Sequence, residues 1–160
     1  MAILTPAELV RIAGIRPELR ALVLPIMQAV EDATGKKLTI PPRGGLRTYA
    51  QQVDLWNDRA NNPYPVAQPG RSYHEFGAAV DLNIIGGTDD DYAMMATIVQ
   101  QRYGLVSAYP SDRVHVRLPI TLEQAQESWQ NLQQVRTQSF TLIAVAAGVL
   151  LLVASTSRRS

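Results

Sequence analysis

Two histidines and one aspartate, His74, His115 and Asp81, are the residues best suited to chemistry in this chain of 160 residues. A catalytic zinc ion commonly takes its protein ligands from imidazole and carboxylate groups and leaves one position for water. The chain has no cysteine, so any metal must bind through His, Asp or Glu. The helical zinc motif H-E-x-x-H is excluded, because His74 and Glu75 begin it but residue 78 is alanine. Spacing alone leaves open that each histidine is an ordinary hydrogen-bonded residue.

Two stretches of alternating hydrophobicity are expected to carry these side chains. Residues 79–84 (AVDLNI) and 113–118 (RVHVRL) alternate as half-buried strands do, which places Asp81 and His115 opposite the apolar residues. His74 follows a polar, proline-rich loop that enters the first of these strands. Pairing of the two strands would therefore bring all three side chains to one face of a sheet.

Helical periodicity and helix-end signals surround these strands. Pro17 suits a first helical turn, Gly35 suits a helix end, and Thr48 with Gln51 forms a capping box. The fold class expected is α+β, with a small antiparallel sheet carrying the zinc site on one face and helices on the other. Besides the two strands, the pattern predicts a strand beginning at Leu38 and helices over 6–14, 17–34, 48–61, 90–102 and 121–138.

Three motifs carry a resemblance to a known superfamily. The signature S-x-H-x-x-G-x-A-x-D runs from Ser72 to Asp81, and an acidic residue, Asp112, precedes His115 by three positions. A third motif, G-x-R-[ST], covers residues 45–48 and precedes a helix with an early glutamine. In this order, and over about residues 40–118, the chain resembles the LAS metallopeptidases. These include D-Ala-D-Ala carboxypeptidases and dipeptidases, L-alanyl-D-glutamate endolysins and the hedgehog signalling domain.

The resemblance implies a ligand set and a base. His74, Asp81 and His115 would bind one zinc ion, and Asp112 would act as general base on the zinc-bound water. Because positions three apart on a regular strand face opposite ways, this role requires Asp112 to lie in a turn before the strand. The alternative is that Asp112 is simply a turn-forming aspartate.

The same resemblance implies further roles around the cleft. Arg47 would stabilise the oxyanion that forms on the scissile carbonyl, unless it makes a surface ion pair instead. Ser72 would contact the substrate or support a ligand, and Gln51 would orient Arg47 or the substrate. Tyr73 is expected to line the cleft, although an aromatic residue near a strand also suits a core.

The function implied is a zinc metallopeptidase that cleaves a peptide bond in the stem peptide or cross-bridge of bacterial peptidoglycan. Many carboxypeptidase members carry glutamate at the base position, whereas Asp112 is more like the endolysins. The resemblance therefore leaves open whether the enzyme is a carboxypeptidase or an endopeptidase. The rival interpretation is a non-catalytic protein that uses the same fold to bind a metal or a wall peptide.

Composition and the C-terminal sequence set the remaining expectations. A net charge of +1 provides no basic field for nucleic acid. No secretion signal is visible, whereas residues 140–156 hold no charged side chain, so residues 139–156 are predicted to be a single-pass membrane anchor rather than a buried core helix. The predicted organisation is a peptidase domain at 1–120, a helical stalk at 121–138, the transmembrane helix and a basic tail at 157–160.

This anchor suits a phage lysis or entry enzyme, or a wall-remodelling enzyme, in a bacterial inner membrane or a virion membrane. The partners expected are a peptidoglycan peptide and a lipid bilayer. The sequence leaves open the side of the membrane on which the domain lies, and it carries no sign of an oligomeric state.

Overall fold

The computed structural model describes residues 2–135 and residue 137. The chain divides into two compact units, residues 1–125 and 126–160, and the first contains every strand that the structure describes and every predicted site residue. Its helices are α1 (Pro6–Ile12), α2 (Pro17–Thr34), α3 (Tyr49–Asn57) and α4 (Asp89–Tyr103), with short 3-10 turns η1 (Arg59–Asn61) and η2 (Tyr73–Phe76). Its strands are β1 (Leu38–Thr39), β2 (Ala79–Asp81), β3 (Asn83–Ile84), β4 (Val106–Ala108) and β5 (Asp112–Arg117).

The helices begin at the residues that the sequence signals indicate, whereas the helices predicted at 6–14 and 48–61 end earlier, at Ile12 and Asn57. The Thr5 and Thr48 side chains cap α1 and α3, each in a reciprocal capping box, the second with Gln51 as predicted. Pro17 opens α2, and Gly35 ends it in the left-handed conformation with φ at 70°. These signals act within a few residues of each helix end, so local sequence is enough to place them.

The strands form two small antiparallel sheets, one with the order β1-β3 and one with the order β2-β5-β4. The predicted strand at 79–84 is interrupted at Leu82, because the chain passes there from one sheet to the other. Strand β4 was not predicted from the sequence, since its three residues are too few to show a period.

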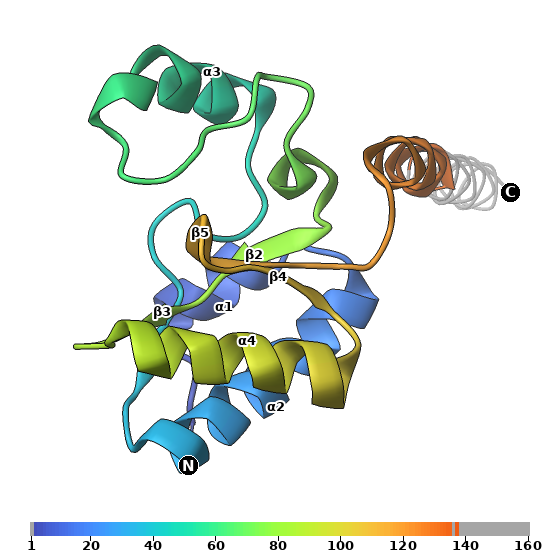
Figure 1. Cartoon of the computed structure of the whole chain (residues 1–160). Coiled ribbons are helices and arrows are strands. Elements are labelled where there is room, and N and C mark those ends of the chain that lie inside the picture. The colour runs from blue at the N-terminus through green and yellow to red at the C-terminus, as the bar shows by residue number, and fades with distance from the viewer. Residues whose placement is uncertain (1, 136, 138–160) are drawn as a thin grey trace, which may run out of the picture. The chain divides into compact units, whose positions relative to one another are not determined.

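A hydrophobic core lies on the face of the strands opposite the predicted site. The apolar positions of the two alternating stretches are buried, as predicted: Val80, Leu82, Ile84, Val114, Val116 and Leu118. Helix α4 packs on β4 and β5 and also on α2. In the view of Figure 1, α4 runs below these strands and α3 lies above them. The α+β architecture expected from the sequence is therefore confirmed.

The predicted stalk is helical over residues 122–135. Within the part of the chain that the structure describes, no helix has both the length and the apolar character needed to cross a membrane. The predicted anchor at 139–156 and the basic tail at 157–160 lie outside the described residues.

Candidate metal centre

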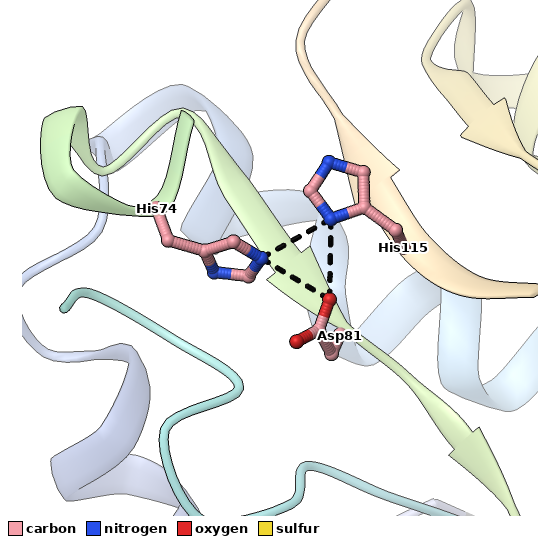
Figure 2. A group of neighbouring side chains, drawn as sticks. All are labelled: His74, Asp81 and His115. Carbon is pink, nitrogen blue, oxygen red and sulfur yellow. Dashed lines mark hydrogen bonds and ion pairs between the residues drawn. The ribbon is translucent and has the colours of Figure 1, made fainter. Parts of the chain in front are cut away.

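The side chains of His74, Asp81 and His115 point toward one another from three different elements (Figure 2). His74 Nε2 lies 3.1 Å from Asp81 Oδ1 and 3.1 Å from His115 Nδ1. His115 Nδ1 lies 3.2 Å from Asp81 Oδ1, which closes the triangle. The structure therefore brings together the three residues that the sequence singled out.

The register of two strands positions Asp81 and His115. Strands β2 and β5 are antiparallel, and Asp81 is the direct cross-strand partner of His115. Side chains at directly opposed positions share one face of a sheet, with their Cβ atoms close together. The backbone N–H of Asp81 also donates to the carbonyl of Gly44 at 2.7 Å, which ties β2 to the segment leading to Arg47.

The short turn η2 positions His74. Ser72 caps this turn with its hydroxyl, which accepts from the His74 backbone N–H at 3.3 Å. Gly77 ends it at a φ of 61°, in the left-handed region that favours glycine. Ser72 is buried and thus supports a candidate ligand through the backbone, one of the two roles expected for it.

The orientation of the His74 ring suits a metal ligand. Its Nδ1 lies 2.8 Å from the carbonyl oxygen of Gly45, which can only accept, so Nδ1 carries the proton. Nε2 is then left with a lone pair directed at Asp81 and His115. Metal-bound imidazoles commonly donate their other N–H to a carbonyl or carboxylate in this way, which fixes the tautomer and the ring orientation. Only glycine fits at position 45, because an added Cβ would be 2.0 Å from the Arg11 carbonyl oxygen.

The spacing of the three ligand atoms fits zinc. Zinc bonds of about 2.0–2.1 Å at tetrahedral angles place ligand atoms about 3.3 Å apart. The observed separations of 3.1 to 3.2 Å are close to this value. The donor set, two imidazoles and one carboxylate, is also one that catalytic zinc sites use. The residues present therefore fit this ion.

The protonation states of His74 and Asp81 also favour the binding of a cation. Burial lowers the pKa of His74, which keeps the imidazole neutral and able to donate its lone pair. Burial alone would raise the pKa of Asp81, but the two adjacent imidazoles hold it well below its ordinary value. The site thus presents an ionised carboxylate beside a neutral imidazole.

Arg47 lies inside the site rather than on the surface. Its Nη2 donates to Asp81 Oδ2 at 2.9 Å, and its Nε donates to the carbonyl of Arg43 at 2.7 Å. Burial lowers the pKa of Arg47, an effect that the charges of Asp81 and Asp112 oppose. The alternative of a surface ion pair is therefore wrong, since the side chain of Arg47 is only 14% exposed.

The glutamine that orients Arg47 is Gln52, so the prediction that Gln51 orients Arg47 is wrong, and its alternative role toward the substrate stays a prediction. Gln51 turns outward and caps Thr48 through its side-chain oxygen. Gln52 is fully buried, accepts from Arg47 Nη1 at 3.2 Å and donates to the carbonyl of Ala67 at 2.7 Å. Adjacent helical residues point about 100° apart, so a one-residue choice decides which side chain enters the site.

Asp112 faces the same cavity. Among the buried side-chain atoms of the described residues, its Oδ1 is the one oxygen or nitrogen with no hydrogen-bond partner. Burial and the charge of Asp81 raise the pKa of Asp112. An unpaired buried carboxylate oxygen lowers the stability of the folded protein. Its presence in a cavity therefore indicates that it binds a ligand or accepts a proton there.

The predicted turn position of Asp112 needs a correction. Asp112 is the first residue of β5, opposite Ala108, directly after the turn at 109–111. The pairing of β4 with β5 shifts register between Ser107 and Ala108, so regular alternation does not hold across this end of the strand. This irregularity lets Asp112 line the same cavity as His115 although the two are three positions apart.

The cavity has a volume of about 470 Å³. The three candidate metal ligands line it, and so do four other predicted site residues: Arg47, Asp112, Ser72 and Tyr73. The Tyr73 hydroxyl donates to the carbonyl of Ile120 at 3.1 Å, and the Arg117 guanidinium lies over its ring at 4.5 Å. Ile120 and Arg117 thus fix the position of Tyr73 in the cavity lining, and its contact with a substrate stays a prediction.

No protein-family model matches the sequence, and no curated protein matches it. The structure does match solved ones. LdcB, an LD-carboxypeptidase studied for peptidoglycan recognition, has 22% identity and a TM-score of 0.52, over 74% of this chain and 71% of LdcB. DacB, an L,D-carboxypeptidase from Streptococcus pneumoniae, has 20% identity and a TM-score of 0.50, over 74% of this chain and 72% of DacB.

This chain shares its fold with these two carboxypeptidases. The likeness covers about three quarters of the chain. In this chain the shared fold gathers His74, Asp81 and His115 at one wall of the cavity, with Arg47 and Asp112 beside them.

Proposed function

We propose that the protein is a zinc-dependent peptidase that cleaves a peptide bond in bacterial peptidoglycan. One observation carries this proposal: Asp112, with an unpaired buried oxygen, lines the same cavity as the three converging ligand atoms. A site that only binds a metal or a peptide gains nothing from an unpaired carboxylate next to it. A hydrolase needs such a group to accept a proton from water.

Zinc, held by His74, Asp81 and His115, would lower the pKa of a bound water to about 7 and polarise the substrate carbonyl. Asp112 accepts the proton of the attacking water at its free Oδ1 and donates it to the leaving amine. Its raised pKa makes this return of the proton easier than for an ordinary aspartate.

Arg47 supplies positive charge where the oxyanion develops. Its Nη1 donates to Gln52 and its Nη2 donates to Asp81, so each of these nitrogens keeps a second N–H for the substrate carbonyl oxygen. Gln52 and the Arg43 carbonyl hold the guanidinium in place before substrate arrives, which reduces the cost of ordering it in the transition state.

The substrate class is supported by the fold. LdcB and DacB are LD-carboxypeptidases, and LdcB is described in terms of peptidoglycan recognition. We infer that this chain acts on the same class of polymer, as a carboxypeptidase or as an endopeptidase. Mass spectrometry of the products of a defined muropeptide distinguishes these two, since it identifies the bond that is cut.

The decisive experiment compares wild type with Asp112→Ala. Both proteins are expected to bind one equivalent of zinc, whereas muropeptide cleavage by the variant falls by about 10²–10⁴-fold. Asp90→Ala, an exposed carboxylate change on α4, is the matched control and should cleave as wild type does. Equal cleavage by wild type and Asp112→Ala would remove the base from the mechanism. No cleavage by any of them, with zinc bound, would favour the non-catalytic interpretation.

We also propose that residues 139–156 anchor the protein in a membrane, as their freedom from charge suggests. A phage lysis or entry enzyme, or a wall-remodelling enzyme, would be held near its substrate by such an anchor. Sedimentation of the full chain with bacterial membranes, compared with a chain that ends at residue 138, tests this. Recovery of both in the soluble fraction would rule the anchor out.

A further inference from the structure

Two arginines at the cavity, Arg43 and Arg71, have no part in the proposed mechanism. Both residues line the cavity and both are exposed. Within the part of the chain that the structure describes, neither guanidinium makes a hydrogen bond, an ion pair or a cation–π contact. The charge of Arg71 contributes to lowering the pKa of Glu123, but the two side chains do not form an ion pair.

We propose that Arg43 and Arg71 bind a free carboxylate of the substrate, so that the enzyme selects an anionic peptide over its amidated form. This inference rests on the proposed peptidase function and adds the charge of the substrate to it. The carboxylate has two sources in a wall peptide, the C-terminus and a side chain, and both have the same chemistry. A planar guanidinium recognises either one through paired N–H donors.

Arg47 shows by contrast why these two arginines are available. Each nitrogen of its guanidinium donates to a protein oxygen, and its charge is paired with Asp81. Arg43 has the same cavity beside it but uses only its backbone carbonyl, as the acceptor for Arg47 Nε. The structural work in this segment is thus done by Arg47 and by the Arg43 backbone, which leaves the Arg43 side chain for a ligand.

The backbone at Arg43 also makes this side chain unusual. Its φ is 64°, and among the described residues it is the one non-glycine residue with a positive φ. This region disfavours any residue with a Cβ, and glycine or asparagine would be accepted there more readily. No hydrogen bond, ion pair or cation–π contact of the side chain within the described protein offsets this strain, which supports a role for the arginine in binding a ligand.

The charges of the cavity are complementary to an anion. Three arginines line it, and the carboxylates that line it are Asp81 and Asp112. Asp81 is paired with Arg47 and faces the candidate zinc position, so it does not neutralise the other two arginines. Arg43 and Arg71 come from two separate segments and line the same cavity as Arg47 and His74, so a ligand in this cavity is accessible to both arginines.

The test uses three forms of one muropeptide: with all carboxyls free, with the side-chain carboxyl amidated, and with the C-terminal carboxyl amidated. Wild type is expected to show a kcat/KM about tenfold higher for the free form than for whichever amide removes the recognised group. In the double variant Arg43→Gln with Arg71→Gln this ratio should fall toward one, mainly through KM. The preference of wild type between the two amides identifies the source of the carboxylate.

Salt and a control variant separate a binding role from a structural one. KM of wild type for the free form should rise with sodium chloride, and this dependence should shrink in the double variant, because salt screens exposed charges. Arg102→Gln, an exposed arginine change on α4 outside the cavity lining, should keep the wild-type ratio.

An unchanged ratio in the double variant would overturn the inference while the peptidase function stands. If wild type cleaves none of the three peptides, the proposed function fails instead. Calorimetric binding of the same peptides then tests the inference, and equal affinity for the free and amidated forms would refute it.

Discussion

Arg47 and Asp81 form an ion pair, with 2.9 Å between Nη2 and Oδ2, while Asp81 turns its other oxygen toward His74 and His115. One carboxylate thus joins the arginine that is proposed to stabilise the oxyanion to the proposed metal ligands. Metal affinity and catalysis should therefore change together when this pair is altered.

Replacing Arg47 with lysine tests that coupling. Lysine keeps the charge but cannot reach Asp81, Gln52 and the Arg43 carbonyl together, because it lacks the planar fork. We expect zinc affinity to fall about 10- to 100-fold and kcat to fall about 10²–10³-fold. Competition with a chelator and steady-state kinetics measure the two effects. A drop in kcat with unchanged zinc affinity would show that Asp81 is held without Arg47.

Removal of the metal should destabilise the fold as well as abolish cleavage. Zinc bound only to the folded protein stabilises it by about 3–4 kcal/mol at 100 to 1,000 times its dissociation constant. Chelator-treated protein is therefore expected to unfold several degrees lower than zinc-loaded protein. His74→Ala should lose this difference, because it removes a ligand. A melting temperature that does not respond to zinc in wild type would argue against the site.

The neighbouring glutamines of α3 make a matched pair of variants. Gln52→Ala leaves the Arg47 Nη1 donor and the Ala67 carbonyl without partners in a buried place, which should cost about 1–3 kcal/mol and lower kcat. Gln51→Ala removes only a helix cap, which should cost about 1 kcal/mol without loss of activity. Denaturant unfolding and muropeptide kinetics measure both. Similar kinetics for the two variants would contradict the role given to Gln52.

Acid sensitivity should depend on Glu8. Burial alone would raise the pKa of Glu8, but hydrogen bonds from Thr5, Ile40 and Thr39 lower it from 4.5 to about 2. Since the folded pKa lies below the unfolded one, the stabilisation is complete above pH 4.5 and is lost as pH falls toward 2.

Glu8→Gln is therefore expected to lower the free energy of unfolding by about 1–3 kcal/mol at pH 7. The same variant should flatten the pH dependence of stability between pH 4.5 and about 2. Unfolding curves measured over this range give both quantities. Glu18→Gln changes an exposed carboxylate on α2 and is the control. An equal acid slope in the two variants would show that other carboxylates dominate.

Some of the site could be predicted because its rules are local. Alternation with a period of two places Asp81 and His115 on the polar sides of their strands in any register. Caps such as Thr48 with Gln51 depend on a few neighbouring residues. The motif from Ser72 to Asp81 likewise encodes a capped turn, a left-handed glycine and a strand in direct succession.

The sequence by itself thus determined which residues are the candidates for the chemistry and which side of each element they occupy. Only the tertiary structure decided that Asp81 lies opposite His115, that the Gly45 carbonyl orients His74, and that Gln52 holds Arg47. It also decided that a register shift turns Asp112 into the cavity. The physical reason is that these contacts join segments far apart in the chain, whose register and docking depend on packing of the whole core.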